Sequence, residues 1–159
     1  MLEQQEYIGL LIGAARRRLK QAVLTRLVPH PLTPQQFWLL LAIRDLPGAS
    51  LGAVAERQRL DLPTASRVVQ SLGERGLVLL ERSLEDRRRA SVKLTAKGEG
   101  LIKKLQPIAD GVRGAVVQGL SGGEQETLRK LLRRVIVNLD AHVAGGAPLA
   151  AVKRKAVKA

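Results

Sequence analysis

The chain has 159 residues, of which 45% are hydrophobic, which is long enough for one compact core and too apolar for a disordered chain. The absence of cysteine excludes disulfides, thiolate catalysis and thiolate metal ligands. A formal net charge of +13 is far from that of an ordinary soluble enzyme and predicts a polyanionic partner.

A first helix is predicted over residues 3–27, where apolar residues recur at helical spacing. A second helix follows Thr33, which suits the N-cap position, with Pro34 as its first helical residue. Pro47 and Gly48 end this second helix. We expect its buried stripe to consist of Phe37, Leu40, Leu41 and Ile43.

Two short helices joined by a tight turn are predicted next. Ser50 is placed to cap a helix that runs to about Gln58, and Asp61 starts the following helix. Gly76 ends that following helix as a C-cap glycine. Its apolar stripe is narrow and leaves the opposite side polar; the stripe consists of Ala65, Val68, Val69 and Leu72.

The periodicity then changes from helical to extended. Residues 77–82 and 90–94 have the pattern of two strands, and the charged residues 83–89 between them form the basic tip of a hairpin. Thr95 is placed to cap a long helix, which Pro107 should kink or interrupt.

The end of the chain is predicted to hold one more helix and a tail. Ser121 and Glu124 have the spacing of a capping box and begin the helix. Residues 144–159 are rich in alanine, glycine and lysine, and we expect a flexible basic tail there. The apolar stripe of the last helix consists of Leu128, Leu132, Val135 and Leu139.

No segment approaches the roughly 20 uninterrupted apolar residues that span a bilayer, so we expect no membrane partner. Arginines and a lysine interrupt the N-terminal segment, which excludes a secretory signal there. The chain has only two histidines and no convergent carboxylate spacing, so neither a metal ion nor another cofactor is expected. A reducing cytoplasm is compatible with the lack of cysteine and is the expected location.

The polar side of the helix after Asp61 carries side chains that suit contacts with DNA. Arg67 and Gln70 are residue types that pair with base edges in the major groove, and hydroxyls suit phosphates or bases. Thr64 and Ser66 also have a second interpretation, in which each only caps or back-bonds its own helix. The predicted DNA contacts are Thr64, Ser66, Arg67, Gln70 and Ser71 in the helix, and Arg87, Arg88 and Arg89 in the hairpin tip, which suits the minor groove.

Residues 32–101 resemble the MarR family of winged helix-turn-helix transcription regulators. The resemblance rests on Leu72-Gly73-Glu74-Arg75-Gly76-Leu77-Val78, Asp86-Arg87-Arg88 and Leu94-Thr95-Ala96-Lys97-Gly98. It implies a mainly α fold, in which a three-helix core and a β-hairpin wing are flanked by N- and C-terminal dimerisation helices. It also implies that Asp86 holds Arg88 by an ion pair at the wing tip, and that residues 62–75 form the helix that reads DNA.

The predicted organisation therefore has four segments. They are an N-terminal dimerisation helix in residues 1–31, a DNA-binding region in 32–98, C-terminal dimerisation helices in 99–143 and the tail in 144–159. The flanking helices carry more apolar surface than one small monomer covers, so we expect a homodimer. A symmetric dimer requires a pseudo-palindromic site on double-stranded DNA, with half-sites roughly 10 base pairs apart.

The leading hypothesis is a repressor that a small molecule, such as an aromatic acid, releases from DNA. His30 and Trp38 are its candidate ligand contacts because they lie where the first two helices meet, although Trp38 also suits a core position and His30 an ordinary loop position. The alternative is an effector-independent architectural DNA-binding protein, which the high net charge favours. An enzyme is not expected, because no nucleophile with a nearby base, paired carboxylates or phosphate-binding glycine loop is present.

Overall fold

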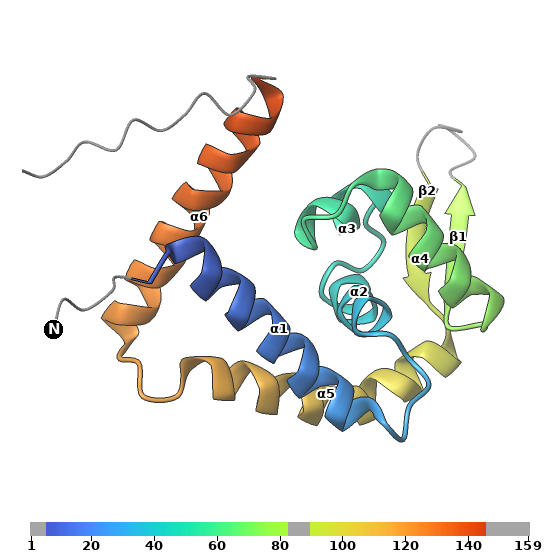
Figure 1. Cartoon of the computed structure of the whole chain (residues 1–159). Helices are drawn as coiled ribbons and strands as arrows, with labels where there is room; N and C mark the ends of the chain where they lie inside the picture. Colours follow the sequence, from blue (N-terminus) through green and yellow to red (C-terminus); the bar gives the residue numbers. More distant parts are fainter. Residues whose placement is uncertain (1–5, 83–89, 146–159) are drawn as a thin grey trace, which may run out of the picture. The chain divides into compact units, whose positions relative to one another are not determined.

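The computed structural model describes residues 6–82 and 90–145, which form two compact units, one ending at Val116 and the other beginning at Val117 (Figure 1). The predicted fold class is confirmed, since the described residues are mainly helical with one antiparallel hairpin. The elements are α1 (Ile8–Leu27), α2 (Pro34–Asp45), α3 (Leu51–Arg57), α4 (Leu62–Glu74), β1 (Val78–Arg82), β2 (Ala90–Leu94), α5 (Ala96–Val117) and α6 (Gly122–Ala144).

The helix starts that short-range chemistry predicts are confirmed at three places. Thr33 and Gln36 form a reciprocal capping box at the start of α2, with Pro34 as the first helical residue. Ser50 accepts a hydrogen bond from the Ala53 amide at the start of α3, and Asp61 caps α4. The predicted start of α1 is too early, because Glu6 and Tyr7 are not helical and residues 1–5 lie outside the described residues.

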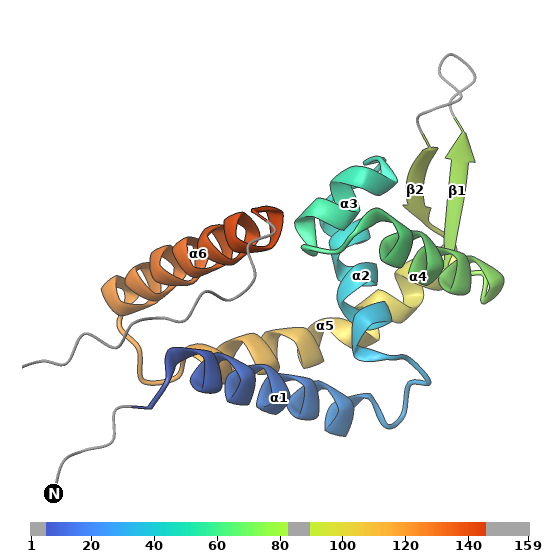
Figure 2. The same cartoon turned by 45° about the horizontal axis from the view of Figure 1, so that its top comes forward.

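α2 lies at the centre of the first unit, where it packs against α1, α3, α4 and β2 (Figures 1 and 2). Its buried residues extend beyond the predicted stripe, because Leu39 and Ala42 are buried as well. Complete burial of one such leucine side chain contributes about 1.5–3 kcal/mol. The α2 residues below 3% exposure are Phe37, Leu39, Leu40, Leu41, Ala42 and Ile43.

The hairpin pairs Val78 with Leu94 at its base and Arg82 with Ala90 at its far end. A short third segment joins the other edge of β2, where Val92 donates to the Ala49 carbonyl at 3.0 Å, next to the start of α3. The wing therefore shares backbone hydrogen bonds with the turn that leads into α3, and this fixes the hairpin beside the helix pair.

α5 begins where Thr95 caps it, and it packs on the core through Ile102, Leu105 and Ala109. α5 continues through Pro107, so the predicted alternative of an interruption is wrong, while the alternative of a kink stays a prediction. The proline removes one backbone donor, and the residues two positions before and after it, Leu105 and Ala109, are buried in the core. Val23 and Leu27 of α1 belong to the same core cluster as these α5 residues.

The second unit consists mainly of α6, which starts at the predicted capping box of Ser121 and Glu124. This helix of 23 residues contains no buried residue. Its apolar side chains are therefore only partly covered within the chain. Among the described helices, none has both the length and the apolar character needed to span a membrane.

Candidate nucleic-acid interface

The N-terminal end of α4 is held by a small network of polar side chains. The Asp61 carboxylate accepts from the Thr64 amide at 2.7 Å and from the Thr64 hydroxyl at 2.9 Å. These bonds hold the pKa of Asp61 below its ordinary value, and the positive charge of Arg67 acts in the same direction. Thr64 is therefore engaged in capping, which was the second of its two predicted roles.

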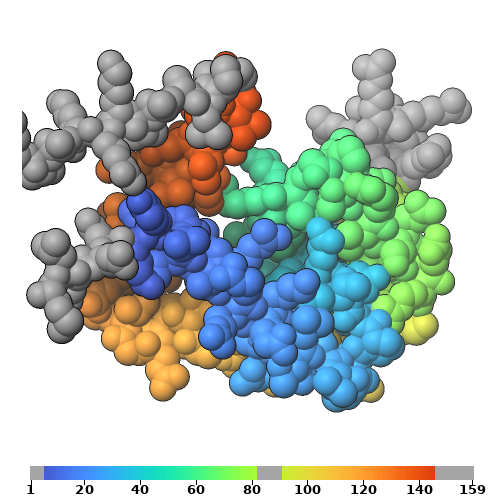
Figure 3. All heavy atoms as spheres, in the orientation of Figure 1, coloured from blue at the N-terminus to red at the C-terminus, as the bar shows by residue number. Residues whose placement is uncertain are grey.

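The exposed side of α4 carries Arg67 and Gln70, as predicted, together with Ser66. The Arg67 guanidinium donates to the Thr64 hydroxyl at 3.4 Å, and the Gln70 amide donates to the Glu74 carboxylate at 3.3 Å. Both contacts join neighbouring turns of one helix, so they orient the two side chains without burying them. Figure 3 shows α3, α4 and β1 as one continuous surface.

Ser71 differs from its predicted outward position. It is half-buried, and its hydroxyl accepts a hydrogen bond of 2.9 Å from the Gln36 side-chain amide of α2. A helical wheel places this residue near the polar edge, but α2 packs against that edge of α4. The structure thus separates Ser71 from the exposed pair of Arg67 and Gln70.

The C-terminal end of α4 is attached to two other elements. Gly76 has a φ of +67°, and the Leu77 amide donates to the Leu72 carbonyl at 3.0 Å, which completes a Schellman motif and confirms the predicted glycine cap. Arg75 donates to the Pro31 carbonyl at 2.7 Å, and Lys97 donates to the Arg75 carbonyl at 2.8 Å. The end of α4 is thereby attached to the α1–α2 loop and to the start of α5.

A close backbone approach supports the same junction. A Cβ atom at Gly98 would collide with the Leu77 carbonyl oxygen, so only glycine lets α5 pass this near the turn after α4. Thr95 adds a hydrogen bond from its hydroxyl to the Gly76 carbonyl at 2.7 Å. The orientation of α4 is therefore coupled to the start of α5.

The remaining predicted DNA contacts belong to the segment between the two strands of the wing. Its strands are described up to Arg82 and from Ala90, and Lys93 pairs with Glu81 across them at 2.6 Å. The predicted tip residues Asp86, Arg87, Arg88 and Arg89 lie outside the described residues. Their predicted contacts with the minor groove stay predictions.

The two candidate ligand residues occupy different surroundings. His30 lines a cavity of about 410 Å³ beside the C-terminal end of α4. Trp38 packs edge-on against buried Phe37, with ring centroids 4.8 Å apart, and the Arg113 guanidinium lies 5.8 Å from its ring centroid. The Trp38 ring is partly buried and packs against the core of the first unit, and its role as a ligand contact stays a prediction.

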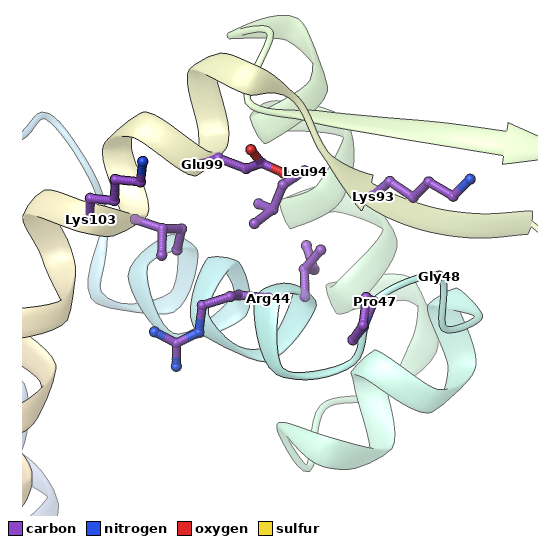
Figure 4. A pocket seen from close by; sticks show the side chains of 9 residues that line it. Arg44, Pro47, Gly48, Lys93, Leu94, Glu99 and Lys103 are labelled. Carbon is purple, nitrogen blue, oxygen red and sulfur yellow. The ribbon is translucent and has the colours of Figure 1, made fainter.

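A second cavity, of about 660 Å³, lies at the base of the wing between α2, β2 and α5 (Figure 4). Its lining combines apolar side chains with Arg44, Lys93, Lys103 and Glu99. Arg44 pairs with Asp45 at 2.6 Å, and Lys93 is the residue paired with Glu81. In residues 6–82 and 90–145, no three carboxylates or histidines gather in a way that would hold a metal ion.

Solved structures share this architecture. BpsR of Bordetella bronchiseptica, studied for regulation of its DNA binding by 6-hydroxynicotinic acid, is 28% identical, with a TM-score of 0.72 over 85% of this chain and 96% of BpsR. The Staphylococcus aureus MepR–DNA complex matches with a TM-score of 0.76 over 86% of this chain and 99% of MepR, and at 21% identity that likeness concerns the fold alone. The chain is a winged helix-turn-helix protein.

The sequence relatives narrow this class. A model described as "MarR family" matches residues 30–89. The transcriptional regulator HosA of Escherichia coli O111:H- is 35% identical over 105 residues, which cover 66% of this chain and 78% of HosA. The chain belongs to the MarR family of transcriptional regulators.

Proposed function

We propose that the protein is a homodimeric repressor of transcription that reads a pseudo-palindromic site in double-stranded DNA and is released by a small organic effector. The observation that carries the proposal is the exposed side of α4, where Arg67 and Gln70 are oriented beside a winged hairpin. An α-helix of this kind fits the major groove, and the adjacent wing reaches the minor groove.

The chemistry of the two exposed side chains supports sequence reading. An arginine pairs in bidentate fashion with O6 and N7 of guanine, and a glutamine pairs with N6 and N7 of adenine. Arg67 and Gln70 lie less than one turn apart on α4, so they would reach neighbouring base pairs. In the proposed complex, Arg87, Arg88 and Arg89 insert at the minor groove from the wing tip.

The apolar surface of α6 supports a second copy of the chain as its partner. Leu131 and Leu139 are 52% and 57% exposed, and no α6 residue is buried. A monomer seldom leaves so long an apolar stripe in water, and a two-fold interface covers the same stripe on both copies. α1 adds exposed Ile8 and Leu10 near its beginning.

The effector response is supported by the likeness to BpsR, whose DNA binding is regulated by 6-hydroxynicotinic acid. An effector that binds the DNA-free arrangement of the two α4 helices more tightly than the DNA-bound arrangement would lower the affinity for the operator. The ratio of the effector's affinities for the two arrangements sets the largest possible decrease. For this chain we propose aromatic carboxylates as the compounds to test first.

A random-sequence selection on the purified full chain tests the proposal. A repressor that reads DNA through two α4 helices selects an inverted repeat, whereas an architectural protein, which the net charge of +13 favours, selects only a composition bias. Arg67→Ala should remove the preference at one base pair of each half-site, a discrimination of about 1–3 kcal/mol. Lys103→Ala removes the same charge from α5 and should leave the selected sequence unchanged.

In vitro transcription from a promoter that carries the selected site then tests repression. The protein should lower transcript yield, and an active aromatic carboxylate should restore it. A selected pool without any inverted repeat would overturn the repressor and favour the architectural alternative.

A further inference from the structure

The helices α3 and α4 end in the same backbone motif, with different residues at its left-handed position. At the end of α3 the Leu60 amide donates to the Ala55 carbonyl at 2.9 Å, which is the same Schellman pattern as at the end of α4. The left-handed residue is Gly76 after α4, with a φ of +67°, and Arg59 after α3, with a φ of +51°. Among the described residues, Arg59 is the only residue other than glycine that has a positive φ.

This backbone conformation is unfavourable for arginine. A left-handed residue brings its Cβ atom close to the following carbonyl oxygen, and glycine avoids this penalty because it has no Cβ. For that reason glycine is the usual residue at this position of a Schellman motif. Strained residues of this kind are concentrated at functional sites. An arginine at this turn therefore indicates a role for its side chain.

The side chain of Arg59 does not serve to hold the turn together. Leu60 packs against the core cluster, whereas Arg59 is exposed. Within residues 6–82 and 90–145, Arg59 takes part in no ion pair, and the nearby Asp61 carboxylate is engaged by Thr64. A guanidinium presents its N–H donors in a planar fork that matches a phosphate. The donors of Arg59 thus suit an anionic partner outside the chain.

Arg59 lies where the proposed complex brings a phosphate backbone. It precedes Asp61, the N-cap of α4, by two residues in the turn that joins α3 to α4 (Figure 1). An α-helix about 10–12 Å wide nearly fills a major groove about 12 Å wide, so residues just outside the helix lie at the groove edge. In helix-turn-helix complexes the first helix crosses the backbone and the second enters the groove. The turn between them therefore faces phosphates and not base edges.

We propose that Arg59 binds a phosphate of duplex DNA at the edge of the major groove and thereby sets how α4 is seated in that groove. The inference rests on the proposed DNA-binding function. Phosphate contacts fix the register of a protein on the duplex and carry no sequence information. Arg59 thus positions Arg67 and Gln70 against their base pairs, and its contact with DNA offsets a backbone strain that glycine would avoid.

Urea denaturation of the full chain at one protein concentration tests the strain. Arg59→Gly should lower the equilibrium constant for unfolding about fivefold, because glycine avoids the left-handed penalty. Arg59→Ala loses the same side chain and keeps the Cβ, so its constant should stay within about twofold of the wild type. Gly76→Ala, the reciprocal change at an equally left-handed turn with open space for a Cβ, should raise the constant about fivefold. An Arg59→Gly chain no more stable than the wild type would overturn the strain.

Fluorescence anisotropy over a series of salt concentrations tests the phosphate contact, with the selected operator and a scrambled duplex of equal length. Each phosphate contact contributes about 0.9 to the slope of log affinity against log salt, so Arg59→Gly should lower the slope by about 1.8 in a dimer. The affinity for both duplexes should fall by the same factor, at least about tenfold, because the contact does not depend on sequence.

Two control variants separate charge from position in the same titration. Arg59→Lys keeps the charge at the turn and should keep the slope. Lys103→Ala removes an equal charge from α5 and should leave both the slope and the affinity unchanged. A slope lowered as much by Lys103→Ala as by Arg59→Gly would assign the effect to net charge and overturn the contact.

The same measurements distinguish failure of this inference from failure of the proposed function. Unchanged slope and affinity in Arg59→Gly, with a wild type that prefers the operator, would overturn the phosphate contact alone. A loss of affinity confined to the operator would make Arg59 a base reader and would also overturn it. Equal affinity of the wild type for both duplexes would instead overturn the sequence-reading repressor, with the slope of Arg59→Gly still deciding the phosphate contact. A wild type that binds neither duplex would overturn both.

Discussion

α2 and α6 begin in the same way and differ in what covers them. Thr33 with Gln36 and Ser121 with Glu124 form reciprocal capping boxes at the two helix starts. Six residues of α2 are buried, whereas none of α6 is. The difference shows that a cap depends on four adjacent residues, while burial depends on what the rest of the molecule, or a second copy of it, places alongside.

Phe37→Ala is expected to have the largest effect, because it opens a cavity where α2 is surrounded by the core. The substitution should lower the free energy of unfolding of the first unit by about 3–5 kcal/mol, measured by urea denaturation. Val143→Ala near the end of α6, at a residue 80% exposed, should change it by less than about 0.5 kcal/mol. Equal decreases in the free energy of unfolding for Phe37→Ala and Val143→Ala would contradict the distinction between a buried α2 and an exposed α6.

Leu132→Glu tests whether the exposed stripe of α6 is an interface. Two added charges in the proposed two-fold interface should weaken dimerisation at least about tenfold, detected as a lower mass in sedimentation. Fluorescence of Trp38, the only tryptophan, should stay unchanged because it reports on the first unit. Lys130→Glu is the control on the same helix. A dimer as stable as the wild type would place the interface elsewhere.

Thr33→Ala and Ser121→Ala compare the two capping boxes directly. Each substitution removes one side-chain acceptor for a backbone amide and should destabilise its own helix start by about 1 kcal/mol. Amide hydrogen exchange in the first turn of each helix measures the effect. A far larger loss of exchange protection in Thr33→Ala than in Ser121→Ala would mean that the cap of α2 also supports the burial of that helix.

Acidification should produce the smallest effect and should act on one box only. Hydrogen bonds from the Ser121 hydroxyl and amide hold the pKa of Glu124 below its ordinary value. The stabilisation from this lowered pKa is complete above the ordinary glutamate pKa of about 4.3 and is lost as the pH falls through the folded value. Exchange in the first turn of α6 should therefore accelerate in acid.

Gln36 occupies the corresponding position of the α2 box and carries no proton to gain. The first turn of α2 should therefore keep its protection over the same pH range. Glu124→Gln should remove the pH dependence from α6, and persistence of that dependence in the variant would assign it to another group.

Much of the fold was predictable because its signals are local. Thr33, Ser50 and Asp61 cap the helices that they were expected to cap, and Gly76 adopts the left-handed conformation expected of a helix-ending glycine. The change of period after Gly76 also predicted the hairpin. Each of these features depends on neighbouring residues that lie within a few positions in the chain.

Other features required the packed molecule. Periodicity could not place Ser71 against Gln36, because the packing partner is 35 positions away in the sequence. Pro107 lies inside a continuous helix whose residues Leu105 and Ala109 are buried in the core, whereas the sequence shows only the local penalty of a proline. His30 and Trp38 were grouped because the first two helices meet near them. The structure gives the two rings different neighbours, since His30 lines the cavity beside the end of α4 and Trp38 packs against Phe37 and Arg113.

The sequence by itself determined the helix and strand boundaries to within a few residues, the exposed Arg67 and Gln70, and the family resemblance. Only the tertiary structure decided that His30, Arg75 and Lys97 line one cavity, and that Arg75 and Lys97 attach the end of α4 to the α1–α2 loop and to α5. The physical reason is range: caps and periodicity act along the chain, whereas a cavity is made by side chains that only folding brings together.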